Sequence, residues 1–194
     1  MTRIISGTAR GRKLRVPGDV TRPTSDRARE GLFSSLQVRF GFEGEVVLDL
    51  FAGSGALGLE AGSRGAAEVT LVDDNHRACE TIRANADVVG HPDVHVVESK
   101  ASSFLATVPP DRFSMVLADP PYELSDEAVD AMVAALVPAL MKDAVVVVER
   151  HVDSAEVTWP QGFEKTNQKL KKRTYGIARM DMAIWRGRPE ADER

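Results

Sequence analysis

The sequence is poor in cysteine, histidine and aromatic residues, and it contains no long apolar run. Its single cysteine, Cys79, cannot form an intramolecular disulfide, and its four histidines show no zinc-ligand spacing, so we expect no structural metal. There is neither a run of about 18 apolar residues nor a leader with a cleavage site, and we expect a cytoplasmic protein. With 43% hydrophobic and 28% charged residues, the 194-residue chain has the composition of a globular protein, which excludes disorder and a collagen-like repeat.

Positive charge is concentrated in two segments of a chain whose formal net charge is −4. Residues 1–29 contain eight Lys or Arg and two Asp, and residues 165–179 contain six Lys or Arg and no acid, so each segment carries +6 and the remainder −16. Electrostatic fields act within a Debye length of about 8 to 10 Å, so both segments can attract a polyanion despite the acidic body. A single basic cluster is explained equally well as a solvent-exposed surface, but two clusters favour a nucleic acid as partner.

Short β-branched runs alternate with helical periodicity along the middle of the chain. Runs that are apolar at nearly every position are typical of strands buried on both faces of a parallel sheet. We expect strands at residues 46–50, 69–72, 94–97, 115–118 and 145–148. We expect helices at residues 56–64, 76–89, 102–107 and 126–141. The alternation predicts an α/β fold.

The two ends of the chain follow other patterns. Apolar pairs on either side of Gly7–Gly11 predict a small β-hairpin, and Thr24-Ser25-Asp26 supplies N-cap residue types that open a helix. Residues 163–185 hold two extended segments around a basic turn, which predicts an antiparallel hairpin at the sheet edge. We expect the residues before the main domain to form an appendage for substrate outside the core. We predict a hairpin extension at residues 1–20 and a connecting segment with a helix at residues 21–40. The main domain follows at residues 41–186, and a polar tail at residues 187–194.

The stretch VVLDLFAGSGALGLE places a glycine-rich loop between a strand and a helix. Gly53, Gly55 and Gly58 allow the backbone to approach a ligand closely. Asp73, 20 residues after Gly53, ends the next strand, where a carboxylate can accept the hydroxyls of a ribose. The spacing also matches the dinucleotide fingerprint, so NAD remains a candidate, as does a tight turn without a ligand.

Asp49, near the end of the strand before the loop, helps to distinguish these ligands. A dinucleotide places its pyrophosphate over the loop and the helix N-terminus, where a nearby carboxylate would repel it. S-adenosylmethionine has no phosphate there and carries an α-amino cation and a sulfonium, which an acid beside the loop would favour. The position of Asp49 therefore favours S-adenosylmethionine, provided that its carboxylate points toward the loop.

A second motif, Asp119-Pro120-Pro121-Tyr122, directly follows the fourth predicted strand. Ligands bind beyond the carboxyl ends of parallel strands, so we expect this motif and the glycine loop to face one crevice. The Asp119 carboxylate and the Pro120 carbonyl oxygen can accept the two N–H groups of a nucleobase amine, which turns its lone pair toward a methyl group. Tyr122 can then stack on the base. The alternative is a turn with a packed tyrosine and no chemistry.

Two motifs together carry a resemblance to a known class of enzymes: DLFAGSG (residues 49–55) and DPPY (residues 119–122). They resemble the Rossmann-like, S-adenosylmethionine-dependent amino methyltransferases. With RIISGTARGRKLRVP (residues 3–17) and RPTSDRARE (residues 22–30), nearly the whole chain resembles the bacterial RsmD family. The resemblance implies a mostly parallel seven-stranded sheet with an antiparallel C-terminal edge hairpin and a small N-terminal β-hairpin extension. It also implies methylation of the N2 amine of one guanine in 16S ribosomal RNA.

The resemblance implies a role for each matching position. The methionine part of the cofactor would lie against Asp49 and the glycine loop, its ribose against Asp73 and its adenine near Ala101. The acid that often contacts the adenine is absent from Ser99-Lys100-Ala101, so a backbone N–H or Ser102 would take its place. The implied cofactor-binding residues are Asp49, Ala52, Gly53, Ser54, Gly55, Asp73, Ala101 and Thr24. The implied catalytic residues, which would hold the guanine, are Asp119, Pro120, Pro121 and Tyr122.

The basic segments are the predicted RNA contacts. The N-terminal hairpin would bind RNA, and the segment that contains Arg22 would fold over the active site. The predicted RNA-binding residues are Arg10, Arg12, Lys13, Arg22, Lys171, Lys172 and Arg173. The partner would be 16S rRNA, free or within an assembling small subunit, and we expect a monomer. An adenine-N6 methyltransferase of RNA or DNA and a non-catalytic RNA-binding protein on the same fold remain as alternatives.

Overall fold

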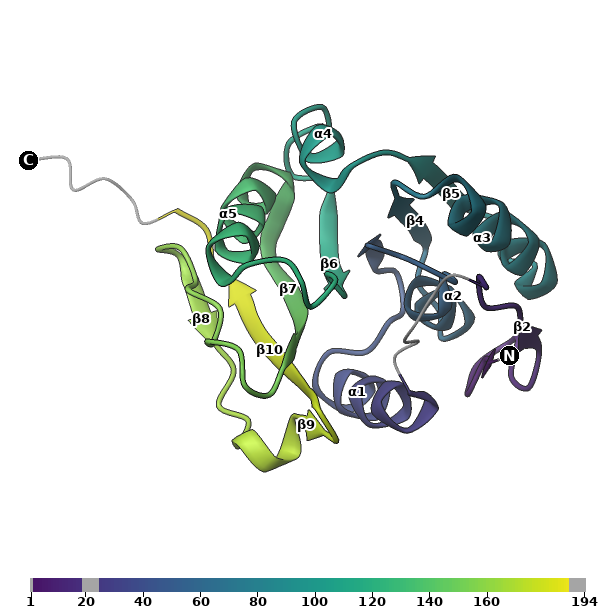
Figure 1. Ribbon diagram of the computed structural model, residues 1–194, viewed down its shortest axis with the longest axis horizontal. Coiled ribbons are helices and arrows are strands. Elements are labelled where there is room, and N and C mark those ends of the chain that lie inside the picture. The colour runs from purple at the N-terminus through teal and green to yellow at the C-terminus, as the bar shows by residue number, and fades with distance from the viewer. Residues whose placement is uncertain (1, 19–24, 189–194) are drawn as a thin grey trace, which may run out of the picture.

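One central sheet contains all the predicted strands of the main domain. The structure is a computed structural model that describes residues 2–18 and 25–188. Five parallel strands lie in the order β5-β4-β3-β6-β7, the antiparallel β10 lies between β7 and β8, and the short β9 pairs with the beginning of β10 (Figure 1). This confirms the α/β fold with an antiparallel C-terminal edge. The strands are Val46–Leu50 (β3), Glu68–Asp73 (β4), Val94–Glu98 (β5), Phe113–Ala118 (β6), Leu140–His151 (β7), Phe163–Lys165 (β8), Thr174–Tyr175 (β9) and Ala178–Trp185 (β10).

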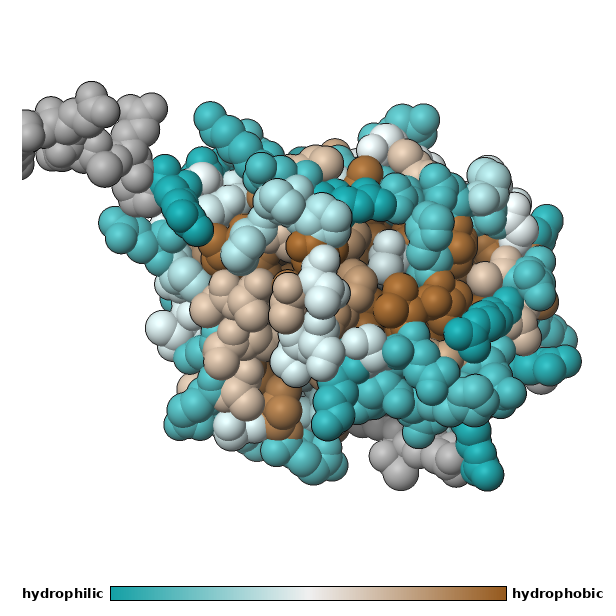
Figure 2. Space-filling view, turned by 90° about the horizontal axis from the view of Figure 1, so that it is seen from above, coloured by the Kyte–Doolittle hydropathy of each residue, from teal (hydrophilic) through white to brown (hydrophobic). Residues whose placement is uncertain are grey.

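Helices cover both faces of the sheet because successive side chains of each strand point to opposite sides. In β3, Val47 packs in the core that contains α1, α2 and α3, whereas Leu48 packs in the core that contains α4 and α5. Seen from above, apolar side chains lie in the middle of the molecule and hydrophilic ones around its rim (Figure 2). The helices are Asp26–Arg39 (α1), Ala56–Ser63 (α2), His76–Val89 (α3), Ala101–Leu105 (α4) and Asp126–Leu136 (α5).

Local sequence signals set most helix boundaries. The side chains of Ser25 and Asn75 cap the N-termini of α1 and α3 by accepting backbone N–H groups. The helix predicted at residues 126–141 is wrong at its C-terminal end, since α5 stops at Leu136. Pro138 cannot continue an α-helix, and a 3₁₀ turn leads directly into β7, which begins earlier than predicted.

The N-terminal hairpin is part of the core. Glu60 of α2 is fully buried and accepts the N–H groups of Ile5 at 2.8 Å and Ser6 at 3.0 Å. Ile4 and Leu14 are fully buried in the same apolar cluster as α1, α2 and α3. The predicted hairpin is therefore confirmed, but the expectation that these residues stay outside the core is wrong. Its strands are Thr2–Arg3 (β1) and Lys13–Leu14 (β2), which pair antiparallel.

The strand order places a crevice at the carboxyl ends of β3 and β6. From β3 the chain continues to β4 and β5 on one side, and it then returns to β6 on the other side of β3. The loops that follow these two neighbouring strands lead away in opposite directions, and open α/β sheets bind ligands beside such a point. The glycine loop follows β3 and the Asp119–Tyr122 motif follows β6, so the topology brings the two predicted motifs together.

Candidate active site

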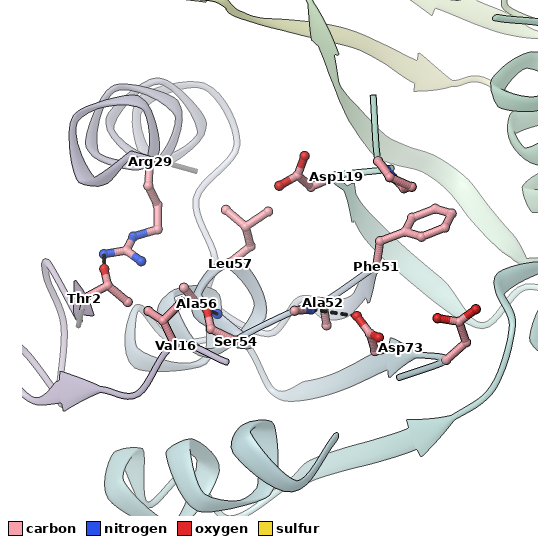
Figure 3. A pocket seen from close by; sticks show the side chains of 13 residues that line it. Thr2, Val16, Arg29, Phe51, Ala52, Ser54, Ala56, Leu57, Asp73 and Asp119 are labelled. Atoms are coloured by element: carbon pink, nitrogen blue, oxygen red, sulfur yellow. Dashed lines mark hydrogen bonds between the residues drawn. The ribbon is translucent and has the colours of Figure 1, made fainter. Parts of the chain in front are cut away.

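Two cavities adjoin at the carboxyl ends of the parallel strands. The first, of about 270 Å³, is lined by the glycine loop and by Asp119 (Figure 3). The second, of about 410 Å³, is lined mainly by apolar residues of α4 and α5, including Ala101. Phe51, Asp73 and Asp74 line both cavities. One elongated ligand can therefore extend from the first cavity into the second.

The glycine loop turns sharply from β3 into α2. Gly55 has a φ angle of +80° where it caps α2, a left-handed conformation that favours glycine. Gly58 permits close packing of α2 on the sheet, because a Cβ atom there would lie 2.9 Å from Cγ1 of Val69. Three loop residues line the first cavity, namely Ala52, Gly53 and Ser54.

Asp73 holds this loop from the end of β4. Its Oδ2 atom accepts the N–H of Gly53 at 2.9 Å, and its Oδ1 atom accepts the N–H of Asn75 at 2.9 Å. These bonds fix the carboxylate at the junction of the two cavities, and each oxygen keeps acceptor capacity for a ligand. A role in holding ribose hydroxyls stays a prediction for this residue.

Asp49 lines neither cavity, in contrast to the interpretation from sequence. It is fully buried beneath the loop, where its Oδ2 atom accepts the N–H of Gly58 at 2.8 Å and its Oδ1 atom has no partner among the described residues. Burial, together with nearby carboxylates, raises the pKa of Asp49 to about 8. The Asp49 carboxylate thus points under the loop instead of into the cavity, so the condition on which its charge would favour a cationic cofactor is not met.

Asp119 is brought into the same cavity as the glycine loop. Its N–H donates to the carbonyl oxygen of Leu50 at 3.3 Å, which holds the start of the motif beside β3. Its carboxylate points into the first cavity in Figure 3, and Pro121 also lines that cavity, whereas Pro120 is buried. An acid and the loop thus face one space, as their positions after neighbouring strands predict.

Tyr122 lies outside the lining of both cavities. Its ring stands edge-on to His151, with ring centroids 5.1 Å apart, and its hydroxyl lies 3.4 Å from Oε1 of Glu149. Glu149 and His151 belong to the carboxyl end of β7, a part of the site that the sequence did not indicate. Stacking of Tyr122 on a base stays a prediction.

The second cavity offers a mostly apolar surface with a polar edge. Leu105 and Met132 contribute apolar side chains, and Ala101 and Ser102 begin α4 at its border. The hydroxyl of Ser99 donates to the carbonyl oxygen of Lys100 at 3.0 Å. A flat apolar ring with polar edges suits such a space, which leaves the predicted adenine contact near Ala101 as a proposal.

The wall of the first cavity opposite Asp73 comes from the N-terminal residues Thr2, Val16 and Arg29 (Figure 3). The sequence interpretation missed this wall. Arg29 precedes Leu32 and Phe33 by three and four residues, so helical periodicity does place it on the buried face of α1. The predicted cofactor residue Thr24 and the predicted RNA residue Arg22 lie outside the described residues.

The predicted RNA-binding residues differ in how free their side chains are. Arg10 and Lys13 are exposed on the N-terminal hairpin, and Lys171 and Lys172 are exposed in the basic turn. Arg12 instead donates from Nη1 to carbonyl oxygens at the C-terminus of α3, at 2.7 and 2.8 Å. The latter arrangement stabilises the helix end.

Two arginines of the C-terminal basic segment form ion pairs within the protein. Arg173 bonds to Glu156 at 2.8 Å and to Asp181 at 2.7 Å, and its side chain is 15% exposed. Arg179 is buried in β10, where it bonds to Asp181 at 2.7 Å. The segment therefore presents less positive charge to a partner than its sequence suggests, and the two ion pairs of Arg173 argue against its predicted role in RNA binding.

One group of potential metal ligands occurs among the described residues. Ligand atoms of Glu68, Asp93 and His95 lie within 4.8 Å of one another, a grouping that residue spacing did not indicate. Arg112 pairs with Glu68, and Asp93 lies 2.7 Å from Nε2 of His95, so these side chains already contact oppositely charged or polar partners.

In the described part of the chain, no helix is long and apolar enough to cross a membrane.

The fold and the site define a class of protein. A parallel sheet that continues into the antiparallel strand β10 between β7 and β8, a glycine loop after β3 and an acid at the end of β4 occur together in the S-adenosylmethionine-dependent methyltransferases, the class of the similar solved structures. Among solved structures, the Escherichia coli protein YhhF superposes with a TM-score of 0.83 at 31% identity, over 96% of this chain and 99% of that chain. A hypothetical protein of Thermus thermophilus superposes with a TM-score of 0.76 at 30% identity, over 94% and 98%.

Sequence comparisons narrow this class to one family. A family model described as "Conserved hypothetical protein 95" matches residues 2–183. Ribosomal RNA small subunit methyltransferase D of Escherichia coli K12 is 37% identical over 171 residues, which cover 87% of this chain and 84% of that protein. The protein of the same name from Haemophilus influenzae is 33% identical over 182 residues, 90% of this chain and 89% of that protein. The chain belongs to this family, the RsmD family of methyltransferases.

Proposed function

We propose that this protein methylates the exocyclic N2 amine of a guanine in 16S ribosomal RNA, with S-adenosylmethionine as methyl donor. The observation that carries the proposal is the position of Asp119, which lines the same cavity as Gly53 and Ser54 of the glycine loop. An acid that binds an amine and a loop that binds a cofactor therefore face one space. The names of the relatives, which act on small-subunit ribosomal RNA, support the class of substrate.

The residues of the recess fit S-adenosylmethionine. The glycine loop would carry its methionine part, Asp73 would accept its ribose hydroxyls, and the apolar cavity beside Ala101 would hold its adenine. The two joined cavities match the elongated shape of this cofactor. When bound, it supplies a methyl group that is activated by a sulfonium.

The chain's own contribution to the reaction is to position the amine. The lone pair of a guanine N2 amine is delocalised into the ring, which makes the nitrogen a poor nucleophile. When the Asp119 carboxylate and the Pro120 carbonyl oxygen accept its two hydrogens, the nitrogen turns toward sp³ geometry and its lone pair points at the methyl carbon. After transfer, the nitrogen releases one proton, which Asp119 accepts. Such positioning can lower the barrier by several kcal/mol.

The guanine must leave its base pair to reach this cavity. Its N2 atom lies on the minor-groove edge, and extrusion of a paired base costs a few kcal/mol. Tyr122 would stack on the extruded base beside Pro121. The exposed side chains of Arg10, Lys13, Lys171 and Lys172, with Arg22, would bind phosphates and offset that cost.

Transfer of tritium from labelled S-adenosylmethionine tests the proposal. The acceptors are naked 16S rRNA and small ribosomal subunits that lack the modification, and Asp119→Ala serves as the inactive control. Label that nucleoside analysis finds on guanine supports the proposal, label on adenine would overturn it, and a comparison of the two acceptors identifies the better substrate. Label on ribosomal proteins alone would overturn it, and so would binding of NADH without binding of S-adenosylmethionine.

A further inference from the structure

Arg29 is a buried cation in the wall of the first cavity. It extends from α1 toward Thr2 and Val16, and its side chain is 1% exposed (Figure 3). On the opposite side, the charged residues that line this cavity are acids, namely Asp73, Asp74 and Asp119. Within the described part of the chain, Arg29 is the one basic residue in the lining, so the cavity has a positive and a negative end.

The guanidinium of Arg29 includes a buried nitrogen that has no partner among the described residues. Its Nη2 atom donates to Oγ1 of Thr2 at 3.1 Å, to Oδ1 of Asp26 at 3.2 Å and to the carbonyl oxygen of Arg3. Its Nε atom is buried and has no hydrogen-bond partner among the described residues. A buried N–H group without an acceptor is costly, and a ligand that supplies the acceptor accounts for its retention.

The positive charge of Arg29 is only partly compensated. Asp26, its ion-pair partner, has a side chain that is 55% exposed, so water screens that attraction. The fully buried Glu60 also stabilises the positive charge, but its carboxylate already accepts N–H groups from the hairpin and from Arg64. The positive end of the cavity therefore favours an anionic group on its ligand.

We propose that Arg29 binds the α-carboxylate in the methionine part of S-adenosylmethionine and donates its Nε–H to it. This inference rests on the cofactor of the proposed function. A guanidinium is planar and matches the geometry of a carboxylate, which makes arginine the usual residue for this contact. With the carboxylate at Arg29 and the ribose at Asp73, the sulfonium lies between them, on the side of the cavity where Asp119 is found.

Arg29 also connects cofactor binding with the substrate side of the protein. Its bonds to Thr2 and to the carbonyl oxygen of Arg3 hold the N-terminal hairpin against α1. A carboxylate at Arg29 thus contacts the same side chain that fixes the hairpin. Arg29 is a binding residue in this account and does not touch the reacting atoms.

Two probes measured by isothermal titration calorimetry on the full chain test this inference. S-adenosylmethionine has the carboxylate, and decarboxylated S-adenosylmethionine lacks it but keeps the ammonium, the sulfonium and the adenosine. We expect Arg29→Gln to weaken binding of S-adenosylmethionine about 10- to 100-fold, the range for a charged hydrogen bond, and to leave binding of the decarboxylated probe nearly unchanged.

Arg150→Gln is the matched control. Arg150 is also a buried arginine with a nitrogen that has no partner among the described residues, but it lines neither cavity. This variant should keep the preference of the wild-type chain for the carboxylated probe. If Arg29→Gln weakens both probes equally, or neither, the inference is wrong. If the wild-type chain binds neither probe, the proposed function itself fails.

A measurement on the wild-type chain covers the case in which Arg29→Gln does not fold. We expect the wild-type chain to bind S-adenosylmethionine at least about tenfold more tightly than the decarboxylated probe. We also expect the NMR signal of one arginine Nε–H to shift with S-adenosylmethionine and to stay in place with the decarboxylated probe. Equal affinities, or no such shift, would overturn the inference.

Discussion

The side chain of Asn85 joins the N-terminal segment to the glycine loop. Its Oδ1 atom accepts the N–H of Arg15 at 2.8 Å, and its Nδ2 atom donates to the carbonyl oxygens of Arg15 and Ser54, both at 2.8 Å. Asn85 is 1% exposed, so water cannot readily replace these bonds. One residue of α3 thus aligns two parts of the chain that line the first cavity.

Asn85→Ala should therefore affect both stability and cofactor binding. Unpaired backbone groups at a buried position cost about 1 to 3 kcal/mol, and we expect a loss of that size in the free energy of unfolding. We also expect weaker binding of S-adenosylmethionine, because Ser54 loses its support. Thermal unfolding and calorimetry measure the two effects. Asp87→Ala, at an exposed position of the same helix, is the control. Unchanged affinity in a destabilised Asn85→Ala chain would limit Asn85 to a structural role.

Asp119→Ala should abolish methyl transfer while cofactor binding is largely kept. Asp119 faces the cavity from the β6 side, whereas the glycine loop and Asp73 belong to β3 and β4. Removal of its carboxylate eliminates the acceptor for the amine and leaves the cofactor-binding residues in place. Transfer assays and calorimetry on the same preparation separate the two effects. Turnover at the wild-type rate would exclude Asp119 from the catalytic role.

Asp49 should make the stability of the chain depend on pH. Its pKa is raised from 3.8 to about 8 by burial, so the unfolded chain ionises first as the pH rises. The contribution of Asp49 to stability is complete below about pH 4 and is lost as the pH approaches 8, at about 1.4 kcal/mol per pH unit. Denaturant titrations between pH 5 and 7 give the free energy of unfolding at each pH. When this free energy is plotted against pH, the slopes for wild type and Asp49→Asn should differ by that amount. Parallel slopes would mean that the carboxyl is already ionised in the folded chain.

Arg10→Glu should weaken RNA binding and reduce its salt dependence. Each phosphate contact adds nearly one unit to the slope of log affinity against log salt, so loss of one contact should lower the slope by about 1. Lys142→Glu makes the same change in charge at an exposed position near the start of β7, outside both basic segments, and should leave the slope unaltered. Equal slopes for wild type and Arg10→Glu would remove the hairpin from the RNA surface.

The elements with local signals could be predicted from the sequence. Helical periodicity predicted residues 76–89, which are the observed bounds of α3, and the apolar run 46–50 is β3. The end of α5 was missed because the helical pattern continues past Pro138. The burial of Arg179 could not be foreseen either, since its pairing with Asp181 within β10 depends on tertiary packing.

The location of the site in the fold could be predicted from the sequence more fully than the residues that line its cavity. Loops after neighbouring parallel strands must meet, so the approach of Asp119 to the glycine loop follows from the strand order. Whether a carboxylate faces the ligand or the interior depends on packing, and Asp49 points under the loop. Helical periodicity places Arg29 on the buried face of α1, but its place in the cavity wall depends on the packing of the N-terminal hairpin against α1, which is a tertiary contact.

The identity of the methylated nucleoside tests the central claim most directly. Small-subunit RNA that has been labelled by this protein with tritiated S-adenosylmethionine is digested to nucleosides and separated by chromatography with mass detection. The account predicts that the label elutes as N2-methylguanosine. Label that elutes as N6-methyladenosine, or that stays with protein, would contradict it.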